Sequence, residues 1–268
     1  MMREEVFSIL TLGNIMFTGG KNIVAFDIVI PSKPGVLASI SNVFSKYNIN
    51  ILSVTLPSTI SEKERVHGFI VGDFSNSLLS PEDIKSKIEE LEVVFEVRIV
   101  KPIEGSIIYS RNLFPIYQGD VRSIMIDQNT IKVLLSLFKE HFGEGFTESL
   151  LYYTGYNTGK AFHKVYIGDK NIKLEEALEL LNAFLIGFGW ARIVNVRLYE
   201  DNIVVQTDRL WECEVLEGKV QGSASRYFKG FLEGFLFSFL KKNIRITETS
   251  CIALGNSFCT FQISIKQC

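Results

Sequence analysis

The side chains that could carry chemistry gather near the C-terminal end of the sequence. Cys251 and Cys259 stand on either side of a turn at Gly255-Asn256-Ser257, and Glu248 comes three residues before the first cysteine. Two cysteines that face each other across a hairpin could form a disulfide, or they could pack as small reduced side chains in a core. The chain has four cysteines, too few for a disulfide framework, and this favours a cytoplasmic location.

No other signature of catalysis is present in the sequence. It has no phosphate-binding loop, no Gly-x-Gly-x-x-Gly after a strand and no His-Glu-x-x-His motif. Its three histidines are far apart. Glu212 and Glu214 alternate with Cys213 on a predicted strand at 210–215, which would put both carboxylates on the face opposite the thiol. We therefore expect a protein that is not an enzyme.

The composition excludes several classes of partner. The 268 residues are 47% apolar and 22% charged, a mixture typical of one large or two ordinary globular domains. A formal net charge of −2 does not favour direct binding to nucleic acid or to a membrane surface. No stretch reaches the roughly 18 apolar residues of a membrane span, and Met1–Glu5 does not resemble the start of a signal peptide.

Strand and helix patterns alternate in the first part of the chain, which we expect to form a domain at 22–101. Apolar and β-branched residues alternate in the first strand, and Ser80-Pro81-Glu82-Asp83 is a strong helix start. The βαββαβ order is that of a split-βαβ, ferredoxin-like unit. The predicted elements are a strand at 23–31, a helix from 36, strands at 51–56 and 66–73, a helix from 81 and a strand at 93–100.

The first of these helices follows a loop with a recognisable motif. The turn Pro34-Gly35-Val36-Leu37 after a strand, with Asn48-Ile49-Asn50-Ile51 after the helix, resembles the ACT domain family. Ser32 stands where that family often has Asp. Gly35 would let backbone N–H groups approach a ligand at a helix start, where the dipole favours a carboxylate. The resemblance implies a paired domain that binds an amino acid or other small effector, with these candidate residues: Ser32, Lys33, Gly35, Val36 and Asn50.

The pattern changes after a connection at 101–111, and we expect a second, mixed α/β domain at 105–265, so that the whole chain is α+β. A strand-like segment at 114–126 opens it. The other predicted elements are helices at 129–142, 146–165 and 174–187, strands at 191–199, 202–207 and 210–215, a helix at 223–241 and a final hairpin at 244–254 and 258–265.

Several short motifs occur in this second part in a fixed order. They are Gly119-Asp120-x-Arg122, Gly187-x-Gly189-Trp190, Gly230-x-x-x-Gly234 and Glu248-x-x-Cys251-x-x-x-Gly255-x-x-x-Cys259-x-Phe261. Together they resemble the 4-vinyl reductase domain, which is related to the sensing domains of phenol-responsive activators and to Bet3-type tethering proteins. The resemblance covers about 105–265. The small residues of the third motif would permit close packing between helices.

This second resemblance implies a zinc site. Members of the family often bind zinc through cysteines around the final hairpin, together with a glutamate and a cysteine from the late helix. Glu248, Cys251 and Cys259 match the hairpin ligands, but Ser225 stands in place of the helix cysteine. Serine is a poor zinc ligand, so the fourth ligand would be Ser225 or Cys213. Reduced core cysteines and a Cys251–Cys259 disulfide remain the alternatives.

The same resemblance implies an apolar sensing pocket between helices and sheet. An aromatic wall with one polar group suits an aromatic or otherwise apolar ligand, although such side chains could equally fill the core. The candidate residues are Tyr152, Tyr156, His163, Phe188, Trp190 and Trp211.

Taken together, these patterns favour a small-molecule-binding regulatory protein that acts as a sensor through a homodimer. One alternative is an accessory protein that helps an enzyme or carrier to assemble. Another is a transcription regulator, which would need a partner protein because no DNA-binding element remains once both domains are assigned. In each case a further protein could receive the signal.

Overall fold

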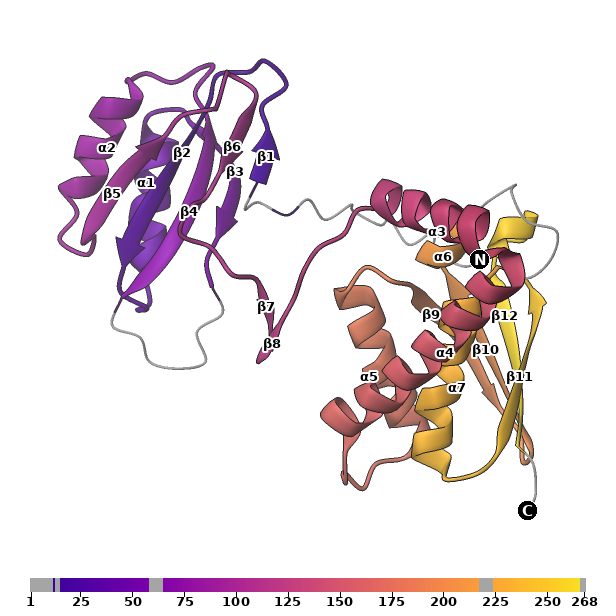
Figure 1. The fold of residues 1–268 in the computed structure, drawn as a ribbon. Coiled ribbons are helices and arrows are strands. Elements are labelled where there is room, and N and C mark those ends of the chain that lie inside the picture. The colour runs from indigo at the N-terminus through magenta and orange to yellow at the C-terminus, as the bar shows by residue number, and fades with distance from the viewer. Residues whose placement is uncertain (1–11, 13–14, 58–64, 217–223, 266–268) are drawn as a thin grey trace, which may run out of the picture. The chain divides into compact units, whose positions relative to one another are not determined.

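The computed structural model describes residues 12, 15–57, 65–216 and 224–265, and it divides into two compact units (Figure 1), Met1–Ile124 and Met125–Cys268. Residues 105–124 therefore lie in the first unit, whereas the sequence analysis began the second domain at 105. Cys268 lies outside the described residues. The mixed α/β character predicted from the sequence is confirmed.

The first unit is built on an antiparallel sheet with the strand order β3-β4-β2-β5. Phe26 and Ile28 of β2 are buried. They pack in one core with Ile40 and Phe44 of α1 and Ile84 of α2. Both helices therefore cover one face of this sheet (Figure 1). The elements are β2 (Ile23–Ile30), α1 (Val36–Lys46), β3 (Asn50–Thr55), β4 (Val66–Asp73), α2 (Pro81–Glu89) and β5 (Glu96–Val100).

Two short strands cover the opposite face of the sheet, and the second of them lies in the segment 101–111 that was predicted to be a connection. β1 (Ile15–Phe17) pairs with β6 (Ile107–Tyr109), and Ile108 packs on Ala25 and Phe69. The Ser110 hydroxyl donates a 2.9 Å hydrogen bond to the buried carboxylate of Asp27. Burial raises the pKa of Asp27, and this hydrogen bond acts in the opposite direction.

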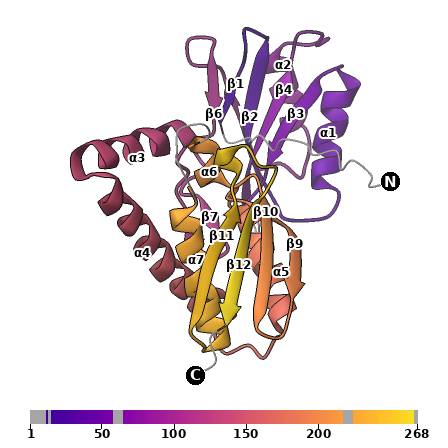
Figure 2. The ribbon, with the colours of Figure 1, turned by 90° about the vertical axis from the view of Figure 1, so that its right-hand side faces the viewer.

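The second unit has an antiparallel sheet with the strand order β11-β12-β10-β9. Its core places Leu181 of α5 and Phe235 of α7 against Val205 and Phe261 of the sheet, so both helices cover the same face (Figure 2). The strands are β9 (Arg192–Leu198), β10 (Asn202–Asp208), β11 (Ile244–Ser250) and β12 (Cys259–Ile265). The helices are α3 (Gln128–Phe142), α4 (Glu144–Phe162), α5 (Leu174–Gly187), α6 (Trp211–Val215) and α7 (Arg226–Leu240). Among the described residues, no helix has the length and apolar composition of a membrane span.

Two predicted strands are wrong. In place of a strand at 114–126 there are only β7 (Tyr117–Gln118) and β8 (Val121–Arg122), joined through Gly119 at φ 57°. In place of a strand at 210–215 there is the helix α6. Arg209 has a positive φ of 51°, so the chain turns out of the sheet before the alternating apolar pattern of this segment begins. The six-residue pattern at 210–215 is too short to separate strand from helix.

Helices α4 and α7 cross with their backbones in close contact. A Cβ atom added at Gly155 or Gly159 would lie less than 3.0 Å from a carbonyl oxygen of α7, and one added at Gly230 or Gly234 equally close to a carbonyl oxygen of α4. The predicted role of the α7 glycines in close packing is thus borne out. Gly155 and Gly159 form the matching pair on α4, so each helix contributes two glycines to the contact. This second pair was not predicted from the sequence.

We predict that Gly159→Ala lowers the free energy of unfolding by about 2–3 kcal/mol, because overpacking forces the two helices apart and outweighs the gain of up to about 1 kcal/mol in helix propensity. Chemical denaturation measures this change. Gly145→Ala in the first turn of α4 is the control, since nothing lies within 4 Å of its added Cβ. Equal effects of the two variants would contradict the close crossing.

Candidate functional site

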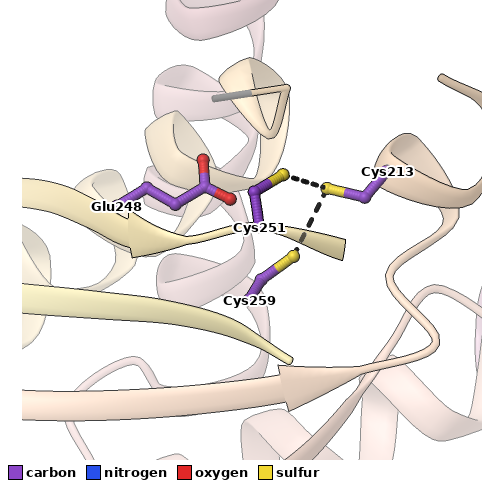
Figure 3. A group of neighbouring side chains, drawn as sticks. All are labelled: Cys213, Glu248, Cys251 and Cys259. Atoms are coloured by element: carbon purple, nitrogen blue, oxygen red, sulfur yellow. Dashed lines mark hydrogen bonds between the residues drawn. The ribbon is translucent and has the colours of Figure 1, made fainter. Parts of the chain in front are cut away.

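Three thiols and one carboxylate converge in the second unit (Figure 3). The ligand atoms of Cys213, Glu248, Cys251 and Cys259 all lie within 4.8 Å of one another. The Sγ atom of Cys213 lies 3.5 Å from that of Cys251 and 3.4 Å from that of Cys259. All three thiols are free and buried. We call these four residues the cysteine cluster.

Two irregularities in the final hairpin bring the cluster together. The pairing of β11 with β12 shifts between Glu248 and Ser250, and such a bulge redirects the side chains that follow it. A 3-10 turn, η2 (Ile252–Leu254), then leads into Gly255 at φ 85°, and the chain returns at Cys259. The backbone N–H of Ile252 donates to the Cys259 Sγ at 3.3 Å.

Ser225, the predicted position of a helix ligand, lies beside the cluster at the start of α7. Its hydroxyl accepts a hydrogen bond from the Cys213 thiol at 3.4 Å and donates one to the Glu248 carboxylate at 2.5 Å. Ser225 is fully buried. The third sulfur of the cluster therefore comes from Cys213 on α6, and Ser225 orients the carboxylate next to it.

The geometry fits a tetrahedral metal ion better than a disulfide. The Cys213 sulfur lies 3.4–3.5 Å from the other two, well beyond the roughly 2.05 Å of an S–S bond, and Cys251 and Cys259 are both free thiols. Around zinc, with Zn–S distances of about 2.3 Å, tetrahedral sulfurs are about 3.8 Å apart. Three thiols and one carboxylate supply four donors, the number found in closed structural zinc sites.

The three thiols influence one another's protonation. Hydrogen bonds with Cys251 and Cys259, together with burial, raise the pKa of the Cys213 thiol, whereas hydrogen bonds with Cys213 and Cys259 lower the pKa of Cys251. A bound cation would allow all three to ionise, because a coordinating thiol loses its proton.

Glu212 caps the start of α7, a role that was not predicted from the sequence. The prediction placed its carboxylate on the face of a strand opposite Cys213. Its carboxylate is fully buried and accepts hydrogen bonds from the backbone N–H groups of Tyr227, at 2.8 Å, and Phe228, at 3.0 Å. Burial raises the pKa of Glu212 to about 8, against the effect of these two donors. The N-cap residue of α7, Ser225, makes no side-chain cap, so Glu212 satisfies that helix start instead.

We predict that Glu212→Ala lowers the free energy of unfolding by about 3 kcal/mol, because two buried N–H groups at the start of α7 lose their acceptor. Glu214→Ala is the matched control on the same short helix. Glu214 is only half-buried and contacts Gln128 and Arg209 near the surface, so its loss should cost under about 1 kcal/mol. Urea denaturation of both variants measures the difference, and similar losses would refute the capping role.

In the first unit, a cavity of about 260 Å³ lies at the start of α1. Ser32, Lys33 and Val36 line it, three of the five residues predicted to bind an effector. Gly35 is the N-cap of α1 and has a φ of 87°, which glycine adopts without strain. Asn50 is not in this cavity. It pairs with Asp73 at the far end of β3, about 20 Å along the strand from the cavity wall.

The aromatic residues predicted to form one pocket lie in three places. Trp190 and Trp211 both contact the Tyr227 ring, with centroids 5.8 and 5.9 Å apart, and Phe188 packs on Trp190. Tyr152 and Tyr156 stack on each other. Burial and a hydrogen bond to a carboxylate of α7 raise the pKa of Tyr152.

His163, at the end of α4, lies apart from both groups and packs against Phe235 and Phe239. Between these places the interior is filled with rings. Phe162, Tyr166 and Phe184 have centroids only 4.2–5.1 Å apart.

No family model matches this chain, and no curated protein matches it. Several solved structures are similar to it. The phenol-responsive sensory domain of the transcription activator PoxR, solved with phenol, is 17% identical, with 60% of this chain and 81% of that chain covered and a TM-score of 0.49. A vinyl-4-reductase family protein from Methanocaldococcus jannaschii is 16% identical, with 54% and 85% covered and a TM-score of 0.39.

An ACT domain from the GTP pyrophosphokinase of Chlorobium tepidum is 18% identical and covers 30% of this chain and 99% of its own, with a TM-score of 0.25. These structures include members of both families that the sequence motifs indicated. With identities below 20% and TM-scores below 0.5, the ligands of those proteins do not transfer to this chain.

Proposed function

We propose that this chain is a small-molecule-binding regulatory protein whose first unit senses an effector at the start of α1. The observation that carries this proposal is the cavity of about 260 Å³ that Ser32, Lys33 and Val36 line. The same loop was singled out from sequence for its ACT-like motif. The effector would regulate the protein by binding to it and would not be chemically changed.

The chemistry of this cavity suits a small carboxylate, such as an amino acid. Lys33 supplies a positive charge. The first turn of α1 contains no acidic residue, and its N-cap, Gly35, offers no side-chain acceptor to the first N–H groups. These groups and the helix dipole favour an anion. Ile30, Leu37 and Leu56 form an apolar wall for the rest of the ligand.

We propose further that the first unit pairs with a second copy along β3. Leu52 and Val54 on this strand and Leu56 just after it are each exposed by 38–39%, and the strand lies at the edge of its sheet. An exposed edge strand with apolar side chains favours pairing with another chain. Because Leu56 also lines the cavity, an effector there would alter the surface that the partner copy meets.

The cysteine cluster supports a second part of the proposal, in which Cys213, Glu248, Cys251 and Cys259 bind one structural zinc ion. The three thiols are buried and Glu248 is half-buried, and four protein donors make a closed set of the structural type. Zinc would supply cross-linking rather than reactivity, since it would hold α6 against the final hairpin. The three thiols, the carboxylate and the Ser225 hydroxyl would each keep a defined partner.

An assembly role is a second candidate, and a specific surface favours it. Helices α3 and the start of α4 carry large apolar side chains that are 44–60% exposed, namely Val133, Leu134, Leu137, Phe142 and Phe146. Contiguous apolar surface of this kind is typical of a protein interface.

Replacing Leu137 and Phe146 with Ser should abolish capture of a partner protein from native extract, whereas the effector response of the first unit should persist.

For the effector site, we predict that a saturating amino acid ligand raises the melting temperature by several degrees, because a ligand that binds only the folded state stabilises it. A thermal-shift screen over amino acids measures this. Lys33→Ala should abolish the shift. Lys46→Ala, at the other end of α1, is the control and should keep it. No shift with any amino acid, or an equal shift in Lys33→Ala, would contradict the proposal.

For the metal site, we predict that protein purified without a tag contains about one zinc per chain, measured by elemental analysis. Cys213→Ser and Cys259→Ser should each lose the metal and lower the melting temperature, since metal binding and folding are coupled. Cys268→Ser tests the remaining cysteine and should retain full zinc content. Zinc-free wild-type protein with unchanged stability in chelator would refute this part of the proposal.

A further inference from the structure

A second cavity, of about 790 Å³, lies in the second unit where α4 and α7 end. Between α4 and α5 the chain forms a π-helical turn, η1 (His163–Ile167), and this turn makes one side of the cavity. The C-terminal end of α7, with Ser238 and Lys241, makes the other side. A volume in the range of about 300–1,000 Å³ is typical of sites for small organic ligands.

The rim of this cavity is strongly basic. Lys160 comes from the last turn of α4, Lys164 from η1, Lys170 from the following loop and Lys241 from the C-cap of α7. Asp169 is the single carboxylate among the lining residues. The chain as a whole carries a net charge of −2, so this gathering of cations is a local feature.

Most of these ammonium groups have no anionic partner in the part of the chain that the structure describes. Lys160 lies 5.7 Å from the centroid of the Tyr156 ring, and Lys170 donates to the carbonyl oxygen of Tyr166 at 2.8 Å. Neither Lys164 nor Lys241 forms an ion pair with a described residue. Like charges four residues apart on a helix repel each other, and an anion bound between them would remove that repulsion.

The floor of the cavity carries two polar side chains that are 91% buried, His163 and Ser238. Neither the imidazole ring nor the hydroxyl forms a hydrogen bond with a described residue. Both side chains line the cavity, so their polar atoms are available to a molecule bound in it. Burial and the charge of Lys241 lower the pKa of His163, which keeps the ring neutral near pH 7 with one N–H to donate.

Helix dipoles explain part of this arrangement, because cations are favoured at helix C-terminal ends. They do not explain why lysines from separate segments of the chain surround a cavity that a histidine and a serine also line. Ile167, Ile172 and Phe239 complete the lining with apolar surface. The site thus combines several cations, two neutral donors and an apolar wall.

We propose that this cavity binds an organic phosphate of nucleotide size, with the phosphate groups held by Lys160, Lys164 and Lys241. His163 and Ser238 donate hydrogen bonds at the floor, and the apolar wall contacts the organic part. A phosphate ester carries more charge and more acceptor oxygens than a single carboxylate, which matches the number of lysines. This site is separate from the effector cavity of the first unit and does not depend on it.

Calorimetric titration of the full chain with pyrophosphate and with AMP tests the proposal. We expect both to bind, AMP with the additional contribution of its organic part, and both to bind more weakly as salt rises. The double variant Lys164→Ala/Lys241→Ala should weaken binding at least tenfold. Lys132→Ala, an exposed lysine of α3, is the matched control and should bind as the wild type does.

Further experiments distinguish binding at this cavity from binding at the effector cavity, and phosphate from other anions. Lys33→Ala should leave pyrophosphate affinity unchanged, so failure of the effector site and failure of this site can be told apart. In NMR spectra, pyrophosphate should shift the His163 ring signals. Absence of binding by both phosphates, equal binding by the double variant, or citrate binding as tightly as pyrophosphate would overturn the assignment to phosphate.

Discussion

The contact between the three sulfur atoms is the constraint on which the second unit depends. Cys213 on α6 meets Cys251 and Cys259 of the hairpin at 3.4–3.5 Å, and Glu248 completes the group. Once α6 is held there, Glu212 on the same helix reaches the start of α7 and accepts its N–H groups. One cluster therefore sets both the hairpin and the helix that covers the sheet.

The position of α7 has consequences further along the fold. Its glycines place α4 in backbone contact with it, and the ends of these two helices then frame the basic cavity. The geometry of that cavity is therefore linked to the cysteine cluster through rigid helices rather than through loops. Ser225 contributes at the junction, because it is the N-cap of α7 and also donates to Glu248.

The two cavities share one physical property, a local positive charge in a chain of net charge −2. In the first unit the charge comes from Lys33 and a helix start. In the second it comes from lysines at helix ends, where N–H groups are not available and side chains must supply the donors. A small carboxylate suits the first arrangement and a phosphate the second. The pair of sites would allow one chain to respond to two anions.

Much of the fold could be predicted from the sequence because the patterns are local. Alternating apolar residues predicted β2, the strand at 66–73 was also predicted as β4, and Ser80 does cap α2 through the predicted N-terminal motif. Hairpin spacing likewise predicted that Cys251 and Cys259 lie near each other.

The rest depends on contacts between distant segments. The α6 segment alternates like a strand, and only its burial against α7 shows why Glu212 and Cys213 are both inside. Gly155 and Gly159 carry no signal until their partner helix is known. His163 does pack against aromatic rings, those of Phe235 and Phe239, but the π-helical turn also places it in the lining of a basic cavity, which the sequence did not predict.

The most direct test of this account is X-ray absorption spectroscopy at the zinc edge on protein purified without a tag. A site made by Cys213, Cys251, Cys259 and Glu248 predicts three sulfur neighbours at about 2.3 Å and one oxygen at about 2.0–2.2 Å. Fewer than three sulfur neighbours, or a shell of nitrogen ligands, would contradict the claim that this cluster binds a metal and holds the second unit together.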